Sequence, residues 1–240
     1  MNENPIIVAL DVDSAAEARR LVAAIGPCGS FYKVGMELYA VAGMDFVREL
    51  LAEGKQVFLD LKLYDIPETV KRTVAQVAPA GVRFLTVHAV GQVMRAASEG
   101  ALGSNLQLLA VTVLTSFGPA DVEEQGYACS VAELVERRAR NAVAAGMHGL
   151  VASPLEVAAL RAAVGPKTIL VTPGVRSAGI AKSDQKRVAT PAEALRKGAD
   201  YLVMGRQITR AADPAAEFAR VLEEIEYKGR GSGAGGQGKE

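Results

Sequence analysis

Three charged residues with catalytic potential stand close together in the chain: Asp60, Lys62 and Asp65 in the segment DLKLYD. Neighbouring carboxylates hold the positive charge of a lysine ammonium group in place. An ammonium group held in this way can stabilise negative charge that develops on a substrate, and it can also donate a proton. In the apolar run VFLDLKL, Asp60 and Lys62 share one face with Phe58, as alternate residues of a strand do. We therefore expect both charges to point to the same side of a sheet.

Two further charged residues fit the same pattern on neighbouring strands. Alternation places Asp11 at the C-terminal end of a first strand and Lys33 on the inner face of a second. These two charges and the Asp60/Lys62 pair sum to zero, so partial burial of all four is tolerable. Asp65, just beyond the strand, would add one negative charge near a substrate. Taken singly, Asp65 could cap a helix and Lys33 could be a solvated lysine, but five charges in consistent alternation indicate a catalytic site.

Glycines and arginines stand at the ends of the last two expected strands. Pro173, Gly174 and Arg176 close one of them, and Gly205 with Arg206 closes the other. Barrel enzymes commonly bind a phosphate group at this place, between backbone N–H groups and a helix N-terminus. We expect Arg206 and Arg176 to bind the anion through their guanidinium groups. The alternative is that the glycines only serve turns and the arginines are solvated.

The segment from Ser177 to Ala189 follows the first of these motifs and has neither a helix nor a strand pattern. Loops of this length are uncommon inside a compact domain unless they serve a function. Beside a phosphate site, such a loop is typical of a lid that closes over the substrate. We expect Gln185 to be its contact with the ligand.

The elements that must position these residues are short apolar strands that alternate with longer helical segments, which indicates repeated βα units and a parallel sheet. Eight strands are expected, over residues 6–11, 31–35, 56–62, 84–89, 108–115, 149–153, 168–173 and 201–206. Eight units in about 230 residues favour a closed (β/α)8 TIM barrel in a single domain over an open doubly wound sheet. Ser14 followed by Glu17, and also Pro67, are typical of helix starts.

Composition fits a globular enzyme that binds neither nucleic acid nor a membrane. The chain has 240 residues, with 27 basic and 27 acidic side chains. No apolar run approaches the ~18 residues of a membrane helix, and the first residues lack a basic signal region, so we expect a cytoplasmic protein. Cys28 and Cys129 are isolated and are expected to be reduced thiols. The barrel is expected over residues 1–227, and the Gly-rich stretch 228–240 is expected to be a disordered tail.

Several segments stand in a characteristic order: ALD and YKVG near the N-terminus, DLKLYDIPETV from Asp60 to Val70, then VTVLTS, VTPGVR and MGR. Together they resemble the orotidine 5'-monophosphate decarboxylase family of bacteria. The resemblance covers essentially the whole expected barrel, and the Asp60 to Val70 segment is its most specific part. Leu63 and Tyr64 depart from the Phe-His of many bacterial members, but neither residue is a charge in the expected network.

The resemblance implies decarboxylation of orotidine 5'-monophosphate to uridine 5'-monophosphate in de novo pyrimidine biosynthesis, without a cofactor or a metal ion. Loss of carbon dioxide from pyrimidine C6 leaves a carbanion that has no conjugated electron sink. The resemblance implies that Lys62, held by Asp60 and Asp65, stabilises this carbanion and then protonates it. Asp11 and Lys33 would orient the ribose hydroxyls and complete the chain of charges.

The resemblance also implies a homodimer with shared active sites. Asp65, Ile66 and Thr69 would then contribute to the site of the neighbouring subunit. Thr115 and Ser116, at the end of the fifth strand, are expected to hydrogen-bond the pyrimidine, although either could simply cap the next helix. The expected partners are therefore a small nucleotide and a second copy of the chain.

Two other functions use parts of this pattern. A metal-dependent sugar-phosphate decarboxylase or aldolase of the same superfamily would share the Asp-x-Lys-x-x-Asp motif. Such an enzyme needs a carboxylate where this chain has Lys33, because a lysine there repels a divalent cation. A non-catalytic nucleotide-binding module on the same scaffold would have no use for Lys62. Dependence on Mg²⁺ would favour the first alternative, and indifference to the loss of Lys62 would favour the second.

The two histidines and three apolar residues are expected to be structural. His88 ends the fourth strand, but the lysine network accounts for the chemistry without it, and a buried histidine bonded to a neighbour is the more frequent case. His148 lies in a helix-to-strand turn and is expected at the opposite end of the barrel. Tyr32, Met36 and Met44 are expected in the core.

Overall fold

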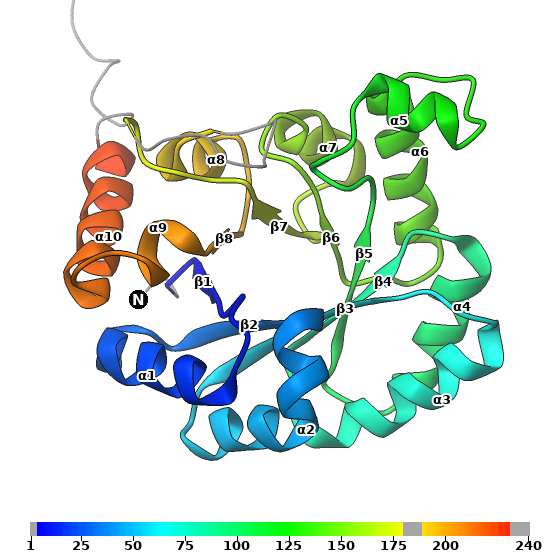
Figure 1. Cartoon of the computed structure of the whole chain (residues 1–240). Helices are drawn as coiled ribbons and strands as arrows, with labels where there is room; N and C mark the ends of the chain where they lie inside the picture. Colours follow the sequence, from blue (N-terminus) through cyan, green and yellow to red (C-terminus); the bar gives the residue numbers. More distant parts are fainter. Residues whose placement is uncertain (1–3, 180–188, 231–240) are drawn as a thin grey trace, which may run out of the picture.

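The protein is a closed parallel barrel wrapped by helices (Figure 1). The structure is a computed structural model, and it describes residues 4–179 and 189–230. The strands follow one another round the barrel in chain order, and β1 pairs with β8 to close it. The (β/α)8 barrel expected from the alternation of strands and helices is therefore confirmed.

The strands are short and end where the chain turns into the loops above the barrel. Their bounds are β1 Ile6–Ala9, β2 Phe31–Gly35, β3 Gln56–Leu63, β4 Phe84–His88, β5 Gln107–Val111, β6 Gly149–Val151, β7 Ile169–Pro173 and β8 Tyr201–Met204. The fifth strand ends at Val111 instead of residue 115. Thr112 and Val113 leave the sheet but stay buried.

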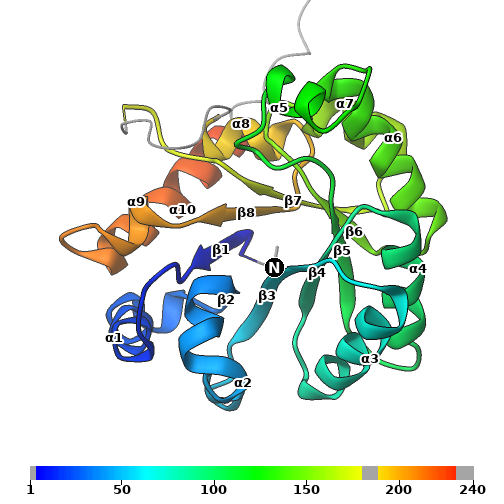
Figure 2. The same cartoon turned by 45° about the vertical axis from the view of Figure 1, so that its right-hand side comes forward.

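The helices cover the outer face of the strands. Their bounds are α1 Ala15–Ile25, α2 Met36–Ala52, α3 Pro67–Val77, α4 Gly91–Gly100, α5 Pro119–Glu124, α6 Val131–Ala144, α7 Val157–Val164, α8 Pro191–Arg196, α9 Arg206–Thr209 and α10 Pro214–Arg230. Neighbouring pairs such as α3 with α4 lie side by side (Figure 2). Among the described residues, no helix combines the length and the apolar character that crossing a membrane requires.

Local signals explain where two of these helices begin. The Ser14 hydroxyl accepts a hydrogen bond from Glu17 N at 3.3 Å at the start of α1, and α3 begins with Pro67. At the other end of the chain, α10 runs to Arg230, so residues 228–230 of the expected tail are helical. The rest of that stretch, residues 231–240, lies outside the described residues.

Alternation along the strands produces two apolar layers, one inside the barrel and one between the barrel and the helices. The inner layer consists of Ile7, Ala9, Phe31, Phe58, Phe84, Leu109, Val171, Tyr201 and Val203. On β3, Phe58 belongs to the inner layer, whereas Val57 and Leu59 belong to the outer one. The predicted alternation of this strand is therefore confirmed, and Asp60 and Lys62 follow Phe58 on the inner face.

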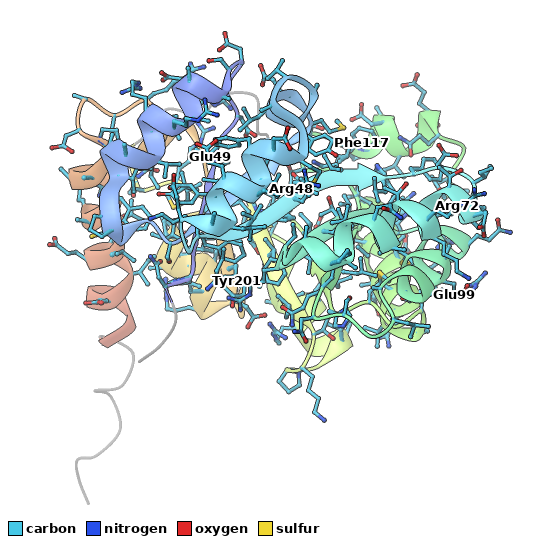
Figure 3. All side chains as sticks on the ribbon, turned by 90° about the horizontal axis from the view of Figure 1, so that it is seen from below. Arg48, Glu49, Arg72, Glu99, Phe117 and Tyr201 are labelled. Atoms are coloured by element: carbon cyan, nitrogen blue, oxygen red, sulfur yellow. The ribbon has the colours of Figure 1, made fainter. Side chains whose placement is uncertain are left out.

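Arg83 closes the N-terminal end of the barrel. Its guanidinium carbon lies 5.2 to 5.4 Å from the ring centroids of Tyr201, Phe84 and Phe31, and Nη2 donates a hydrogen bond to the Tyr201 hydroxyl at 2.5 Å. In Figure 3 Tyr201 lies away from the edge of the molecule, whereas Arg72 and Glu99 lie at its right-hand edge. With this end filled by packed side chains, a binding site is expected at the C-terminal end of the strands.

Two of the three apolar residues expected in the core are buried or partly buried. Tyr32 is fully buried, and Met44 packs against the outer layer. The expectation for Met36 is wrong, because 60 % of its surface is exposed. Met36 begins α2 directly after β2 ends, so its side chain lies at the mouth of the barrel and not under a helix.

Candidate active site

A cavity of about 540 Å³ opens at the C-terminal ends of the strands. Many of the residues selected from the sequence line it: Asp11, Lys33, Asp60, Lys62, Thr115, Pro173, Arg176, Gly205 and Arg206. The charged residues of the first three strands and the arginines after the last two therefore face one common space. Its volume is in the range typical of sites for small ligands.

Two aspartates and two lysines alternate along one wall of the cavity. Lys33 Nζ lies 2.7 Å from Asp11 Oδ1 and 3.6 Å from Asp60 Oδ2. Lys62 Nζ donates a hydrogen bond to the same Asp60 Oδ2 at 2.8 Å. Each ammonium group therefore has a carboxylate beside it, and Asp60 is shared by both. Formal charges that sum to zero make the burial of this chain of charges tolerable.

Asp60 is buried and remains ionised at neutral pH. Only 8 % of its surface is exposed. Burial by itself raises the pKa of the Asp60 carboxyl group, but the charges of Lys33 and Lys62 and hydrogen bonds from Lys62 and Thr86 outweigh it, and the pKa falls below its ordinary value. The carboxylate can therefore hold the Lys62 ammonium in place throughout a reaction near neutral pH.

The backbone of Lys62 has an unusual conformation. Its φ is 49°, and within residues 4–179 and 189–230 it is the only non-glycine residue with positive φ. The register between β3 and β4 also shifts here, since Leu59 pairs with Leu85 and the next pair is Leu63 with Val87. For a residue with a Cβ atom this conformation costs about 1–2 kcal/mol. Strain of this kind persists where the surrounding structure imposes it, which is common at functional sites.

Thr86 is a residue of this site that sequence analysis missed. Its hydroxyl donates a hydrogen bond to Asp60 Oδ1 at 2.9 Å and accepts one from Lys62 N at 2.9 Å. The signal that could have found it is alternation along β4, which puts Thr86 on the inner face between Phe84 and His88. A threonine inside an apolar strand is common, so its residue type alone gives no indication of a role.

The opposite wall of the cavity carries the arginines. Arg206 is the first residue of α9, and Arg176 follows β7. The residues directly after these two arginines are bonded to each other: Gln207 Oε1 accepts from Ser177 N at 3.0 Å, and Gln207 Nε2 donates to Ser177 Oγ at 2.8 Å. This contact holds the two loops together. Arg210, which sequence analysis did not select, adds a third cation to the cavity lining.

The remaining expected site residues lie elsewhere. Ser116 is exposed and does not line the cavity. Asp65, Ile66 and Thr69 are exposed around the start of α3, and Asp65 Oδ1 accepts a hydrogen bond from Ile66 N at 2.6 Å. Gln185 lies outside the described residues. A single chain therefore pairs Lys62 with Asp60 and leaves Asp65 on the surface.

The two histidines stand apart from the chain of charges. The His88 ring lies on the inner face of β4, 5.6 Å from the ring of Tyr64, and burial together with nearby positive charges lowers its pKa. It is therefore neutral at pH 7. The Nδ1 atom of His148 accepts a hydrogen bond from Leu108 N at 3.1 Å, near the N-terminal end of β5. The prediction that His148 lies at the opposite end of the barrel is confirmed.

Comparison with known proteins identifies relatives over the whole barrel. The model of the orotidine 5'-phosphate decarboxylase / HUMPS family matches residues 4–221. The orotidine 5'-phosphate decarboxylase of Bradyrhizobium sp. strain ORS 278 is 53% identical over 220 residues, which cover 92% of this chain and 90% of that protein. The chain belongs to the orotidine 5'-phosphate decarboxylase / HUMPS family.

Other members of the orotidine 5'-phosphate decarboxylase / HUMPS family give the same result. The orotidine 5'-phosphate decarboxylase of Caulobacter sp. strain K31 is 51% identical over 226 residues, which cover 94% of this chain and 99% of that protein. The crystal structure of orotidine 5'-phosphate decarboxylase from Lactobacillus acidophilus superposes with a TM-score of 0.82 at 38% identity, and the match covers 93% of this chain and 99% of that one. The family resemblance of the sequence segments is thereby confirmed.

Proposed function

We propose that this chain decarboxylates orotidine 5'-monophosphate to uridine 5'-monophosphate in pyrimidine biosynthesis. The observation that carries the proposal is one cavity with an alternating chain of lysines and aspartates on one wall and arginines on the other. Such a cavity suits a nucleotide whose phosphate binds the arginines while its base lies beside the lysines. Membership of the family, and relatives that bear the name orotidine 5'-phosphate decarboxylase, support the same substrate.

In this proposal Lys62 acts directly on the reacting carbon. When the bond between C6 and the carboxylate breaks, carbon dioxide leaves and the electron pair stays on C6. The Lys62 ammonium stabilises this charge and then transfers a proton to C6, which completes the product and leaves a neutral amine. A proton from solvent restores the ammonium group. Asp60 supports this role because its ionised carboxylate holds Lys62 Nζ at 2.8 Å.

The neighbouring residues suit the remaining parts of the nucleotide. Asp11 Oδ1 accepts a hydrogen bond from Lys33 Nζ at 2.7 Å, which leaves the other Asp11 oxygen for a ribose hydroxyl. Thr115 lines the cavity and offers a hydroxyl to the pyrimidine. Pro173 and Gly205 line the cavity beside the arginines. Backbone N–H groups at these strand ends would bind the phosphate together with the arginines. These roles remain predictions, as does that of the exposed Ser116.

Replacing Arg206 with alanine is expected to raise KM about 10- to 100-fold, because a charge-assisted bond to phosphate is lost. We also expect a smaller fall in kcat, since binding energy at a remote phosphate can help to order the reacting groups. Steady-state kinetics with orotidine 5'-monophosphate measures both. Arg140→Ala is the matched control, because Arg140 pairs with Glu136 on the outer surface of α6. An unchanged KM for Arg206→Ala would remove Arg206 from the phosphate site.

The proposed reaction requires no metal ion. Lys33 Nζ stands between the carboxylates of Asp11 and Asp60, at 2.7 and 3.6 Å, and its positive charge would repel a divalent cation there. We expect full activity after exhaustive dialysis against EDTA, measured as the loss of orotidine 5'-monophosphate absorbance with and without chelator. Activity that requires added Mg²⁺ would favour a metal-dependent sugar-phosphate decarboxylase or aldolase. No absorbance loss under either condition would rule out the proposed reaction.

We further propose a homodimer in which Asp65, Ile66 and Thr69 reach the active site of the partner subunit. Tyr64 and Ile66 flank Asp65 and are each 67% exposed, so these two large side chains are available to a partner surface. Asp65 lies outside the cavity of its own chain, so its charge is available to the cavity of a second chain.

The cytoplasm is the proposed compartment, which suits a protein with two free cysteines.

A further inference from the structure

The side chain of Thr86 lies at the centre of the charged wall, below the groups that face the cavity. It is fully buried on the inner face of β4. One hydroxyl group makes both contacts: it donates to Asp60 Oδ1 and accepts from Lys62 N, each at 2.9 Å. Both bonds end on residues that the proposed reaction uses, while Thr86 itself does not line the cavity.

The bond to Asp60 determines which carboxylate oxygen meets the lysines. Because Oδ1 is occupied by the Thr86 hydroxyl, Oδ2 receives both ammonium groups, Lys62 at 2.8 Å and Lys33 at 3.6 Å. Rotation of the carboxylate would break this arrangement. The hydroxyl therefore sets the orientation of the one carboxylate that both lysines share.

The bond to Lys62 N supports the unusual backbone of that residue. Between Leu59 and Leu63 the regular pairing of β3 with β4 is interrupted, and Lys62 has a φ of 49° inside this interruption. The side chain of Thr86 supplies a hydrogen-bond acceptor for the Lys62 amide there. Without it, the part-buried amide would lose this acceptor and the strained conformation would lose a support.

We propose that Thr86 is a positioning residue for the decarboxylation, and that its single hydroxyl fixes both the Asp60 carboxylate and the Lys62 backbone in their reactive arrangement. This inference rests on the proposed function of Lys62. The residue acts through its two neighbours and has no contact with the substrate. Its loss should therefore reduce kcat much more than it changes KM.

Thr86→Val tests the proposal, because valine has the same shape without the hydroxyl. We expect kcat to fall about 10- to 100-fold with KM nearly unchanged. This is the size of effect expected when a buried hydrogen bond to a charged group is lost. Thr86→Ser keeps a hydroxyl and should restore most of the activity. If Thr86→Val does not fold, Thr86→Ala carries the same test. Thr172→Val is the matched control, since Thr172 is equally buried on β7, faces away from the cavity, and its hydroxyl has no partner among the described residues.

The pH profile of kcat separates positioning from a purely structural role. The Thr86 hydroxyl is one of the groups that lower the pKa of Asp60, together with Lys33 from β2 and Lys62 from β3. The other titratable groups near this wall are Asp11, paired with Lys33, and His88 on β4, which is neutral at pH 7. Losing the hydroxyl raises the pKa of Asp60, so Asp60 becomes protonated at a higher pH than in the wild type. The acid limb of the kcat profile of Thr86→Val should therefore lie at a higher pH than that of the wild type. Thr86→Ser should return this acid limb to its original position.

Three outcomes would overturn the inference. One is a wild-type kcat for Thr86→Val, and another is an acid limb that does not move. The third is an equal loss of activity in Thr172→Val, which would show that replacing any buried threonine of the barrel with valine lowers the activity. The wild type and Lys62→Ala are assayed in parallel. No turnover by the wild type would defeat the proposed function, and an active Lys62→Ala would remove the proposed role of Lys62. An inactive Lys62→Ala beside a fully active Thr86→Val removes only the role of Thr86.

Discussion

Replacing Lys62 with alanine is expected to lower kcat by about 10⁴-fold or more while the barrel stays folded. The substitution removes the cation that stabilises the carbanion and also the group that protonates it, and each of these contributes about 10²-fold or more. A 10⁴-fold loss corresponds to about 5 kcal/mol of transition-state stabilisation. Single-turnover and steady-state assays with orotidine 5'-monophosphate measure this loss.

The fold should survive this substitution because the contacts of Asp60 are only partly lost. Asp60 keeps the Thr86 hydroxyl at 2.9 Å and Lys33 at 3.6 Å. Its pKa, held low in part by Lys62, rises towards the ordinary value. A carboxylate with a lowered pKa stabilises the fold above its ordinary pKa and loses that contribution as the pH falls. The variant therefore loses part of this stability at neutral pH, about 1–3 kcal/mol by denaturant unfolding.

Two variants control the Lys62 result. Lys167→Ala removes an exposed lysine from the loop before β7, at the other end of the barrel, and should leave kcat unchanged. Lys62→Arg keeps a positive charge but is a poor proton donor, because the guanidinium group stays protonated. Low activity in both Lys62 variants would show that proton transfer is needed in addition to charge. Substantial turnover by folded Lys62→Ala would instead remove the proposed role of Lys62. The non-catalytic nucleotide-binding module would be favoured if the wild type bound the nucleotide without turnover and Lys62→Ala bound it equally well.

The arrangement of the chain of charges could be predicted from the sequence because a closed barrel permits only two side-chain directions. Once Phe58 is assigned to the inside, Asp60 and Lys62 must follow it there, and the neighbouring parallel strands bring Asp11 and Lys33 to the same end. The arginines after β7 and β8 follow from the same rule. Alternation and strand count therefore fix the cavity before any distance is known.

The details of the site could not be predicted, because they depend on contacts between strands and not on patterns along one strand. The positive φ of Lys62 arises where the register of β3 against β4 is interrupted, and nothing in DLKLYD indicates it. The role of Thr86 depends on that same register. Met36 follows the apolar pattern of a core residue, yet the end of β2 places it at the open mouth of the barrel.

Dimers formed from one Lys62→Ala chain and one Asp65→Ala chain are expected to recover about half the turnover of the wild-type dimer, although each parent homodimer is nearly inactive. If Asp65 serves the site of the partner, such a dimer has one site with Lys62 and Asp65 both intact and one site that lacks both. Each chain carries a different affinity tag, and purification over both tags isolates the mixed dimer. Its turnover per dimer is then compared with that of the wild type.

A mixed dimer of Lys62→Ala with a Lys62→Ala/Asp65→Ala chain is the matched control, because neither of its sites has a lysine and no activity can return. The structure gives the physical reason to expect recovery in the first mixture and not in the second. Lys62 lies in the cavity of its own chain, while Asp65 is exposed beyond it, flanked by the exposed apolar side chains of Tyr64 and Ile66. Sites complete within one chain would leave the first mixture as inactive as its parents, and the shared-site dimer would then be wrong.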